Sequence, residues 1–444
     1  MSQNNSLPVV FLYYYWKIIG LCPFRVTNLG LEISILEITI AVVRCLGCLY
    51  VFPNFDYFHR AIHDHGLIVV LSEATGFFTG LIVLLFIWIV SATRVKKIDS
   101  VIKTFMSLHK RLEEMGLEEA RGRDFLRKMS LHSFFVNSFF WIHTFVITTI
   151  FWMVRTVGFS ELLYQSARVV LWNTVVLFVD GVSLIRDKFQ CINNAIENFH
   201  NYLELGDDPR SMRFAQQVFY IARYCNAGEY LRSIGQIHED LKDLLHTVEN
   251  IFAVPILFAI VVNFMECASC LYLIAMTLRS GSTEWTFKEI VAMTTFSTWV
   301  IANLVHMLLI VSIPSLTDEE ANRTGSALHY MWITYRPRNT RFVVEAVSMR
   351  LLQKKTVISL HGLIRLNFPL IYRLANIVVG SLVIMIQLEE HGREFREQLE
   401  FRLQQLPGFP LGSSMGDRNT SEHYGYNSTE DPHSQLFELS TIVP

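Results

Sequence analysis

Long apolar stretches divide this chain and alternate with charged segments. A helix needs about 20 mostly apolar residues to cross the hydrocarbon core of a bilayer, and seven stretches reach that length. The sequence therefore predicts an all-α polytopic membrane protein with seven transmembrane helices. The predicted spans are Leu31–Phe52, Leu67–Ala92, His132–Val154, Leu162–Ile185, Ile251–Thr277, Glu289–Ile313 and Asn367–Gln387.

Composition excludes several classes of protein. Hydrophobic residues make up 51% of the 444 positions and charged residues 18%, whereas soluble domains average about 25% charged residues. We find no phosphate-binding loop, nucleophile elbow or metal-ligand set, so we expect no enzyme activity, metal or cofactor. The 38 basic and 40 acidic residues give a net charge of -2, so no overall field favours nucleic acid or an anionic surface. The expected partner is the lipid bilayer, because of the long apolar stretches.

The distribution of Lys and Arg predicts the orientation in the membrane. Basic residues concentrate after the second, fourth and sixth spans, at Arg94, Lys96, Lys97, Arg186, Lys188, Arg341, Lys354 and Lys355. The positive-inside rule then places the N-terminus in the cytoplasm and the C-terminus outside. This orientation is opposite to that of seven-helix receptors that couple to G proteins.

The two ends of the chain lie outside the predicted spans. Residues 1–30 are predicted to be a cytoplasmic or interfacial segment, with Leu7–Cys22 as an interfacial helix. Residues 31–387 form the predicted channel domain, and residues 388–444 a disordered extracellular tail because they are largely polar. Asn419 and Asn427 stand in glycosylation sequons within that tail.

The predicted cytoplasmic segments carry apolar stripes at helical spacing. The clearest runs from Leu231 to Val248, and similar stripes follow the second span and precede the seventh. We therefore expect the spans to continue below the membrane as a cytoplasmic anchor bundle. Two interpretations remain open: the stripes pack within one chain, or some of them also contact another subunit.

The seventh span follows a predicted break at Gly362 and begins at Asn367, with Pro369 in its first turn. One face of this span mixes polar, small and bulky aliphatic side chains, namely Arg373, Ile377, Gly380, Ile384 and Gln387. Such a face is compatible with a pore lining. From spacing alone, a helix that packs against its neighbours through Gly380 is the better interpretation.

Charged residues inside spans need water, partners or each other, because an isolated charge is costly in the bilayer. Glu73, Arg168 and Glu266 fall in the predicted outer halves of their helices. Hydrogen-bonding and aromatic residues at similar depth complete a candidate ligand pocket, namely Tyr164, Gln165, Trp172, Tyr272, Ser297 and Trp299. The alternative for each residue is structural pairing or aromatic packing.

Other polar residues in the spans are predicted to be structural. We expect Asp180 to make a buried contact between helices, and His143 and His306 to be isolated core histidines. The pairs Cys45/Cys48 and Cys267/Cys270 have the spacing of metal or redox sites. No further ligand completes such a site, so packing between helices is the better interpretation.

Three short segments resemble a known family. The seventh span ends in Gly380-Ser381, five apolar residues and Gln387-Leu388. This resembles the insect gustatory receptors, whose last span usually ends in Thr-Tyr, five hydrophobic residues and Gln-Phe. Gln387 and the apolar residues fit that pattern, while Ser381 and Leu388 depart from it. The segments Lys17–Pro23 and Glu320–Thr324 are also similar to the family.

The resemblance implies a homotetrameric, ligand-gated, non-selective cation channel in the plasma membrane of chemosensory neurons, or a heteromer with related receptors. It implies a small-molecule tastant in the outer half of each subunit and one pore lined by four copies of the seventh helix. Gln387 and Leu388 would form the outer gate, where a hydrophobic ring can close a pore by dewetting. The candidate pore residues are Ile377, Gly380, Ser381, Ile384, Gln387 and Leu388.

Two alternative functions, a G-protein-coupled-type receptor and a transporter, agree less well with the sequence. A G-protein-coupled-type receptor needs the opposite orientation, together with an acidic-Arg pair in span three and an Asn-Pro pair in span seven. A transporter should show paired halves with broken helices at matching depths, and the sequence has no internal repeat. A sugar and a charged bitter compound both remain compatible with the predicted pocket.

Overall fold

The computed structural model describes most of the chain, and the statements below concern these parts alone. They are residues 7–22, 24–27, 30–32, 35–36, 39–40, 42–43, 46–47, 67–117, 133–146, 149, 159–205, 227–279, 285–334 and 338–404. Most of the first predicted span lies outside them. Its charged residues Glu37 and Arg44 and the pair Cys45/Cys48 are among the residues that are not described.

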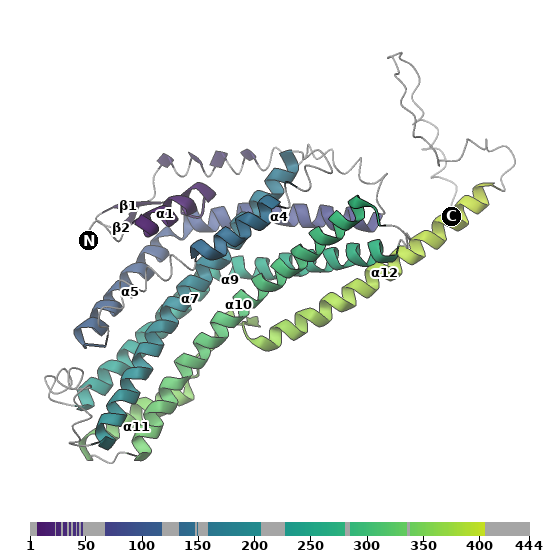
Figure 1. Ribbon diagram of the computed structural model, residues 1–444. Coiled ribbons are helices and arrows are strands. Elements are labelled where there is room, and N and C mark those ends of the chain that lie inside the picture. The colour runs from purple at the N-terminus through teal and green to yellow at the C-terminus, as the bar shows by residue number, and fades with distance from the viewer. Residues whose placement is uncertain are drawn as a thin grey trace, which may run out of the picture. The chain divides into compact units, whose positions relative to one another are not determined.

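Three very long helices run alongside one another and form the body of the protein (Figure 1). They are α7 (Phe159–Leu205), α9 (Ala227–Arg279) and α10 (Phe287–Thr334), of 47, 53 and 48 residues. At about 1.5 Å per residue each exceeds twice the thickness of a bilayer core of about 30 Å. The predicted continuation of spans four to six as helices is therefore confirmed.

The apolar stripes of the helical extensions are buried within the chain. Leu231, Ile234, Ile237 and Leu241 of α9 are each at most 1% exposed, because they face α7, α10 and α5. Helix α5 (Val95–Glu114) follows α4 (Leu67–Thr93) after a bend of 61°. For the stripe of α9, this supports packing within one chain.

Helix α11 (Arg338–Gln353) is separated from α12 (Phe368–Gln404) by a small hairpin of β3 (Ser359–Leu360) and β4 (Ile364–Arg365). The strands are antiparallel, and Leu360 pairs with Ile364. The turn has positive φ at His361 (49°) and Gly362 (74°), the pattern of a type I′ turn. The break predicted at Gly362 is confirmed. The sequence did not predict that the break takes the form of a β-hairpin.

A second hairpin lies near the N-terminus and joins β1 (Arg25–Thr27) to β2 (Gly30–Glu32). The helix before it, α1 (Leu7–Ile19), contacts α7. Its Tyr15 hydroxyl accepts hydrogen bonds from Trp141 Nε1 at 2.7 Å and Asn173 Nδ2 at 3.1 Å. The N-terminal helix is thus tied to the helical bundle by side-chain hydrogen bonds.

In the described residues, four helices are long and apolar enough to cross a membrane, within α7, α9, α10 and α12. A fifth is added if the bent pair α4 and α5 counts as one span, and a shorter apolar helix covers Ser133–Val146. The fold is all-α apart from the two hairpins.

The chain divides into two units, Met1–Glu389 and Glu390–Pro444. The helical body described above belongs to the first unit. The predicted tail began at residue 388, whereas α12 continues as a helix to Gln404. The predicted glycosylation residues Asn419 and Asn427 lie outside the described residues.

Candidate functional site

A buried ion pair joins two of the predicted pocket residues. The Nε of Arg168 on α7 donates to Oε1 of Glu266 on α9 at 2.8 Å, and the two side chains are 14% and 7% exposed. The guanidinium carbon lies 4.0 Å from the ring centre of Trp299 on α10, a cation–π contact. Three residues predicted from separate spans therefore meet at one place.

An aromatic stack adjoins this pair. The Trp172 ring stacks on the rings of Phe140 and His306. Its centre lies 4.7 Å from the centre of Phe140 and 4.5 Å from that of His306. The rings of His143 and Trp299 are nearly perpendicular, and their centres lie 4.8 Å apart. His306 is buried, as predicted for a core histidine. Neither histidine is isolated, because the helix Ser133–Val146 and α10 turn these faces toward α7. We call the set of Phe140, His143, Arg168, Trp172, Asn263, Glu266, Trp299 and His306 the aromatic cluster.

Asn263 completes the aromatic cluster from α9. The Nδ1 of His306 lies 2.8 Å from Nδ2 and 3.0 Å from Oδ1 of Asn263. Asn263 also donates to the carbonyl of Ala259 at 2.8 Å. The amide therefore fixes the orientation of the imidazole that stacks on Trp172.

Several buried polar atoms in and beside the aromatic cluster have no hydrogen-bond partner among the described residues. They are Nδ2 and Oδ1 of Asn137, Oγ1 of Thr144, Nε1 of Trp172, Nδ2 of Asn303 and Nε2 of His306. Buried polar groups are nearly always hydrogen-bonded, so the partners of these atoms are to be sought outside the described residues.

Sequence reasoning missed Asn137, Asn263 and Asn303. A signal was available, because Asn137, Phe140 and Thr144 share one helix face, as do Trp299, Asn303 and His306. A polar residue in step with aromatic residues on an apolar helix faces other helices rather than lipid.

Some predicted pocket residues do not join the aromatic cluster. Tyr272 is 1% exposed, and its hydroxyl lies 3.4 Å from Oε2 of Glu389 on α12. Ser297 is half-buried on α10 and takes no part in the described contacts of the cluster. The side chains of Glu73, Tyr164 and Gln165 lie outside those that the structure describes.

Other predictions about polar and sulfur-containing residues are confirmed. The Ser133 hydroxyl donates to Asp180 in a buried contact between helices. Cys267 packs beside Val378 of α12, and Cys270 beside Trp299. Both cysteines are buried and pack between helices.

Helix α12 is largely exposed in the single chain. It packs on α9 through Val378, which contacts Cys267 and Ala268. Ile377, Ile384 and Leu388 are 52%, 57% and 56% exposed.

The predicted face of α12 is exposed throughout. Arg373, Gly380 and Gln387 are exposed together with Ile377 and Ile384, and Ser381 is half-buried. A Cβ added at Gly380 would meet nothing within 4 Å in the described structure. Packing through Gly380 against the chain's own helices is therefore not observed.

Long apolar helices, buried charges paired between helices and an exposed apolar helix define an all-α polytopic membrane protein. Residues 10–390 match the sequence profile described as 7tm Chemosensory receptor. The chain therefore belongs to this chemosensory receptor family, a family of receptors and not of enzymes. The predicted chemosensory class is confirmed at this level.

Solved structures support the fold. The chain is similar to the insect olfactory receptor OR5 from Machilis hrabei in complex with eugenol, at 11% identity and a TM-score of 0.54, over 87% of this chain and 100% of that one. A structure of the same receptor described without a ligand gives a TM-score of 0.57 at 11% identity, over 86% and 97%. A search of curated proteins finds no match.

Proposed function

We propose that this protein is a gustatory receptor that acts as a ligand-gated, non-selective cation channel in the plasma membrane of chemosensory neurons. Four copies assemble, or this chain assembles with related receptors, and α12 from each subunit lines the central pore. The N-terminus lies in the cytoplasm. The observation that carries the channel proposal is the exposed face of α12, which mixes Ile377 and Ile384 with Gly380 and Gln387.

An exposed apolar helix face calls for a partner or lipid. The polar and small positions on α12 distinguish this face from one made only for lipid. In a ring of subunits, Ile384 and Leu388 form successive apolar constrictions, and Gln387 supplies a polar ring between them. Gly380 and Ser381 keep the helix narrow below the gate.

The proposed ligand site is the aromatic cluster. Arg168 and Glu266 neutralise each other, so neither charge is available to bind a charged ligand. The unpartnered atoms belong to neutral donors and acceptors, such as Asn137 and Trp172. These features favour a neutral small molecule that stacks on rings and both donates and accepts hydrogen bonds, such as a sugar or a phenol, over a charged bitter compound.

Whole-cell recording tests the function directly. Cells that express the full chain are challenged with sugars, neutral phenols and charged bitter compounds, with surface labelling to verify expression. We expect a cation current evoked by a neutral compound and none in untransfected cells. A current that needs a co-expressed related receptor would identify a heteromer. Silence at normal surface expression in both settings contradicts the channel proposal.

An epitope at the C-terminus tests the orientation. We expect an antibody to label it in intact cells, because the predicted tail is extracellular. Labelling that requires permeabilisation would contradict the orientation and, with it, the proposed outer position of the ligand site.

A further inference from the structure

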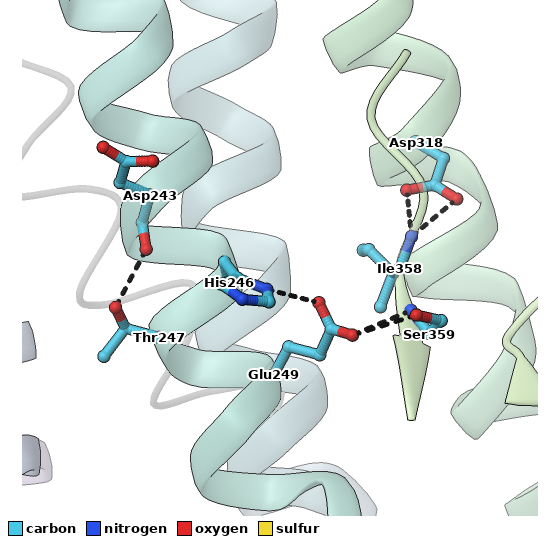
Figure 2. A network of polar contacts seen from close by, with 7 residues as sticks. All are labelled: Asp243, His246, Thr247, Glu249, Asp318, Ile358 and Ser359. Atoms are coloured by element: carbon cyan, nitrogen blue, oxygen red, sulfur yellow. Dashed lines mark hydrogen bonds and ion pairs between the residues drawn. The ribbon is translucent and has the colours of Figure 1, made fainter. Parts of the chain in front are cut away.

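The segment between α11 and α12 is fastened by carboxylates from two other helices. Both carboxylate oxygens of Asp318 on α10 accept the backbone N–H of Ile358, at 2.9 and 3.1 Å. Oε1 of Glu249 on α9 accepts the backbone N–H of Ser359 at 3.1 Å and its hydroxyl at 3.2 Å. Figure 2 shows the two carboxylates on either side of this strand. We call Asp318, Glu249, Ile358 and Ser359 the clasp.

The residues just before the clasp are held in the same way. Asn322 of α10 accepts from the N–H of Thr356 at 2.8 Å and donates to its carbonyl at 2.9 Å. Lys242 of α9 donates to the carbonyl of Lys354 at 2.9 Å. Side chains of α9 and α10 thus determine the path of the whole segment.

Ile358 links the clasp to α12. Its N–H is bound by Asp318, while its carbonyl accepts the N–H of Leu366 at 3.1 Å. Leu366 is buried and stands two residues before Phe368, where α12 begins. The tight turn at Gly362 keeps the two strands together. A displacement of Asp318 therefore reaches the first turn of α12 through two hydrogen bonds and two residues.

The helices that carry the clasp also carry the aromatic cluster. Glu249 and Glu266 both belong to α9, and Asp318 follows His306 on α10 by about 18 Å along the helix. A proline lies between the two sites on each helix, Pro255 on α9 and Pro314 on α10. Proline removes a helical hydrogen bond and permits a bend, so each helix can bend more easily between the aromatic cluster and the clasp.

We propose that Asp318 and Glu249 are positioning residues that set the first turns of α12 and transmit bending of α9 and α10 to it. The effect of the clasp on current rests on the proposed function. The effect of the clasp on the position of α12 is independent of the proposed function, because its hydrogen bonds lie within one chain.

Hydrogen–deuterium exchange on the purified full chain in detergent tests the structural step. The variants are Asp318→Asn and Glu249→Gln, and the matched control is Asp243→Asn. Asp243 is an exposed acid on α9, and the contact drawn for it is made by its backbone carbonyl, which accepts from the Thr247 hydroxyl at 2.9 Å. Figure 2 shows its carboxylate away from the strand.

We expect exchange at residues 356–366 and in the first turns of α12 to rise about tenfold or more in both clasp variants. Asp243→Asn should leave exchange unchanged. Faster exchange in the hairpin with no change in α12 would overturn the proposal, as would an unchanged hairpin.

Recording from the same variants at matched surface expression separates a gating role from a merely structural one. We expect basal or agonist-evoked current to change at least threefold in both clasp variants and not in Asp243→Asn. Unchanged currents despite faster exchange in α12 would overturn transmission to the pore. If the unsubstituted chain carries no current either alone or with a co-expressed related receptor, the channel proposal fails, while the exchange result still decides whether the clasp positions α12.

Discussion

The guanidinium of Arg168 lies 4.0 Å from the ring centre of Trp299, on a different helix. The same side chain is bound to Glu266 at 2.8 Å. The indole covers a charged pair whose burial would otherwise be costly. Three helices are thereby held together at one point, which positions the neighbouring stack of Trp172 and His306.

Removing one partner of this pair should destabilise the protein strongly. Glu266→Gln removes the carboxylate that the buried Arg168 guanidinium contacts at 2.8 Å, so we expect a loss of about 3–5 kcal/mol. The double variant Arg168→Met, Glu266→Leu should lose less, because it removes both charges of the pair together. The stability of both variants is measured by thermal unfolding in detergent, with size-exclusion chromatography used to detect unfolding. A double variant that is as unstable as the single one would show that the pair itself holds the helices.

Asn137→Leu should separate stability from ligand response. Neither amide atom of Asn137 has a partner among the described residues, and a buried unsatisfied group costs about 1–3 kcal/mol. We therefore expect this variant to unfold at a higher temperature, while the agonist response falls because a ligand contact is lost.

Asn173→Leu is the control for Asn137→Leu. The Nδ2 of Asn173 donates to the carbonyl of Val169 at 2.9 Å and to the hydroxyl of Tyr15 at 3.1 Å. Its loss should lower the unfolding temperature. Destabilisation of similar size in both variants would identify Asn137 as a structural residue and contradict its assignment to the ligand site.

The sequence predicts the fold well because lipid and burial impose strong local patterns. The stripe from Leu231 to Val248 has helical spacing and is buried as expected. The Arg168–Glu266 pair was foreseeable, since charges inside spans need partners. The break at Gly362 was predictable because glycine interrupts a helical pattern.

The remainder depends on how helices are rotated against each other. His306 contacts Trp172 only because α7 and α10 meet along those faces, and one chain's pattern cannot specify that pairing. The strands at Ser359–Leu360 and Ile364–Arg365 are too short to show an alternating pattern. The extension of α12 to Gln404 follows a polar, amphiphilic sequence that lacks the marks of a membrane span.

Two glycines should respond to alanine in opposite directions. A Cβ at Gly325 would lie 3.2 Å from Cβ of Leu351 and 3.3 Å from the backbone N of Leu352. Helix α11 must then move, and overpacking of this kind costs about 1–3 kcal/mol. We expect Gly325→Ala to lower the unfolding temperature.

Gly380→Ala is the matched change in α12. A Cβ there meets nothing within 4 Å in the described structure, and alanine favours a helix over glycine by about 1 kcal/mol. The single chain should therefore be stabilised. Equal stabilisation by both substitutions would contradict the close packing of α10 on α11.

The last prediction concerns the proposed gate. Leu388→Ala removes most of an apolar side chain that is 56% exposed in the single chain. A narrow apolar ring keeps water out of a pore. Because alanine widens this ring, we expect the variant to raise the basal current. Gln387→Ala should change ion permeation, because it removes the polar ring beside the constriction. Recordings in two salt compositions measure both effects.

Val379→Ala is the matched control on the same helix. Val379 is 59% exposed but lies on the opposite side of α12 from Leu388 by helical periodicity. It should leave basal current and permeation unchanged at equal surface expression. If Leu388→Ala and Gln387→Ala behave like this control, α12 does not line the pore, and its exposed face must instead meet lipid or another subunit away from the conduction path.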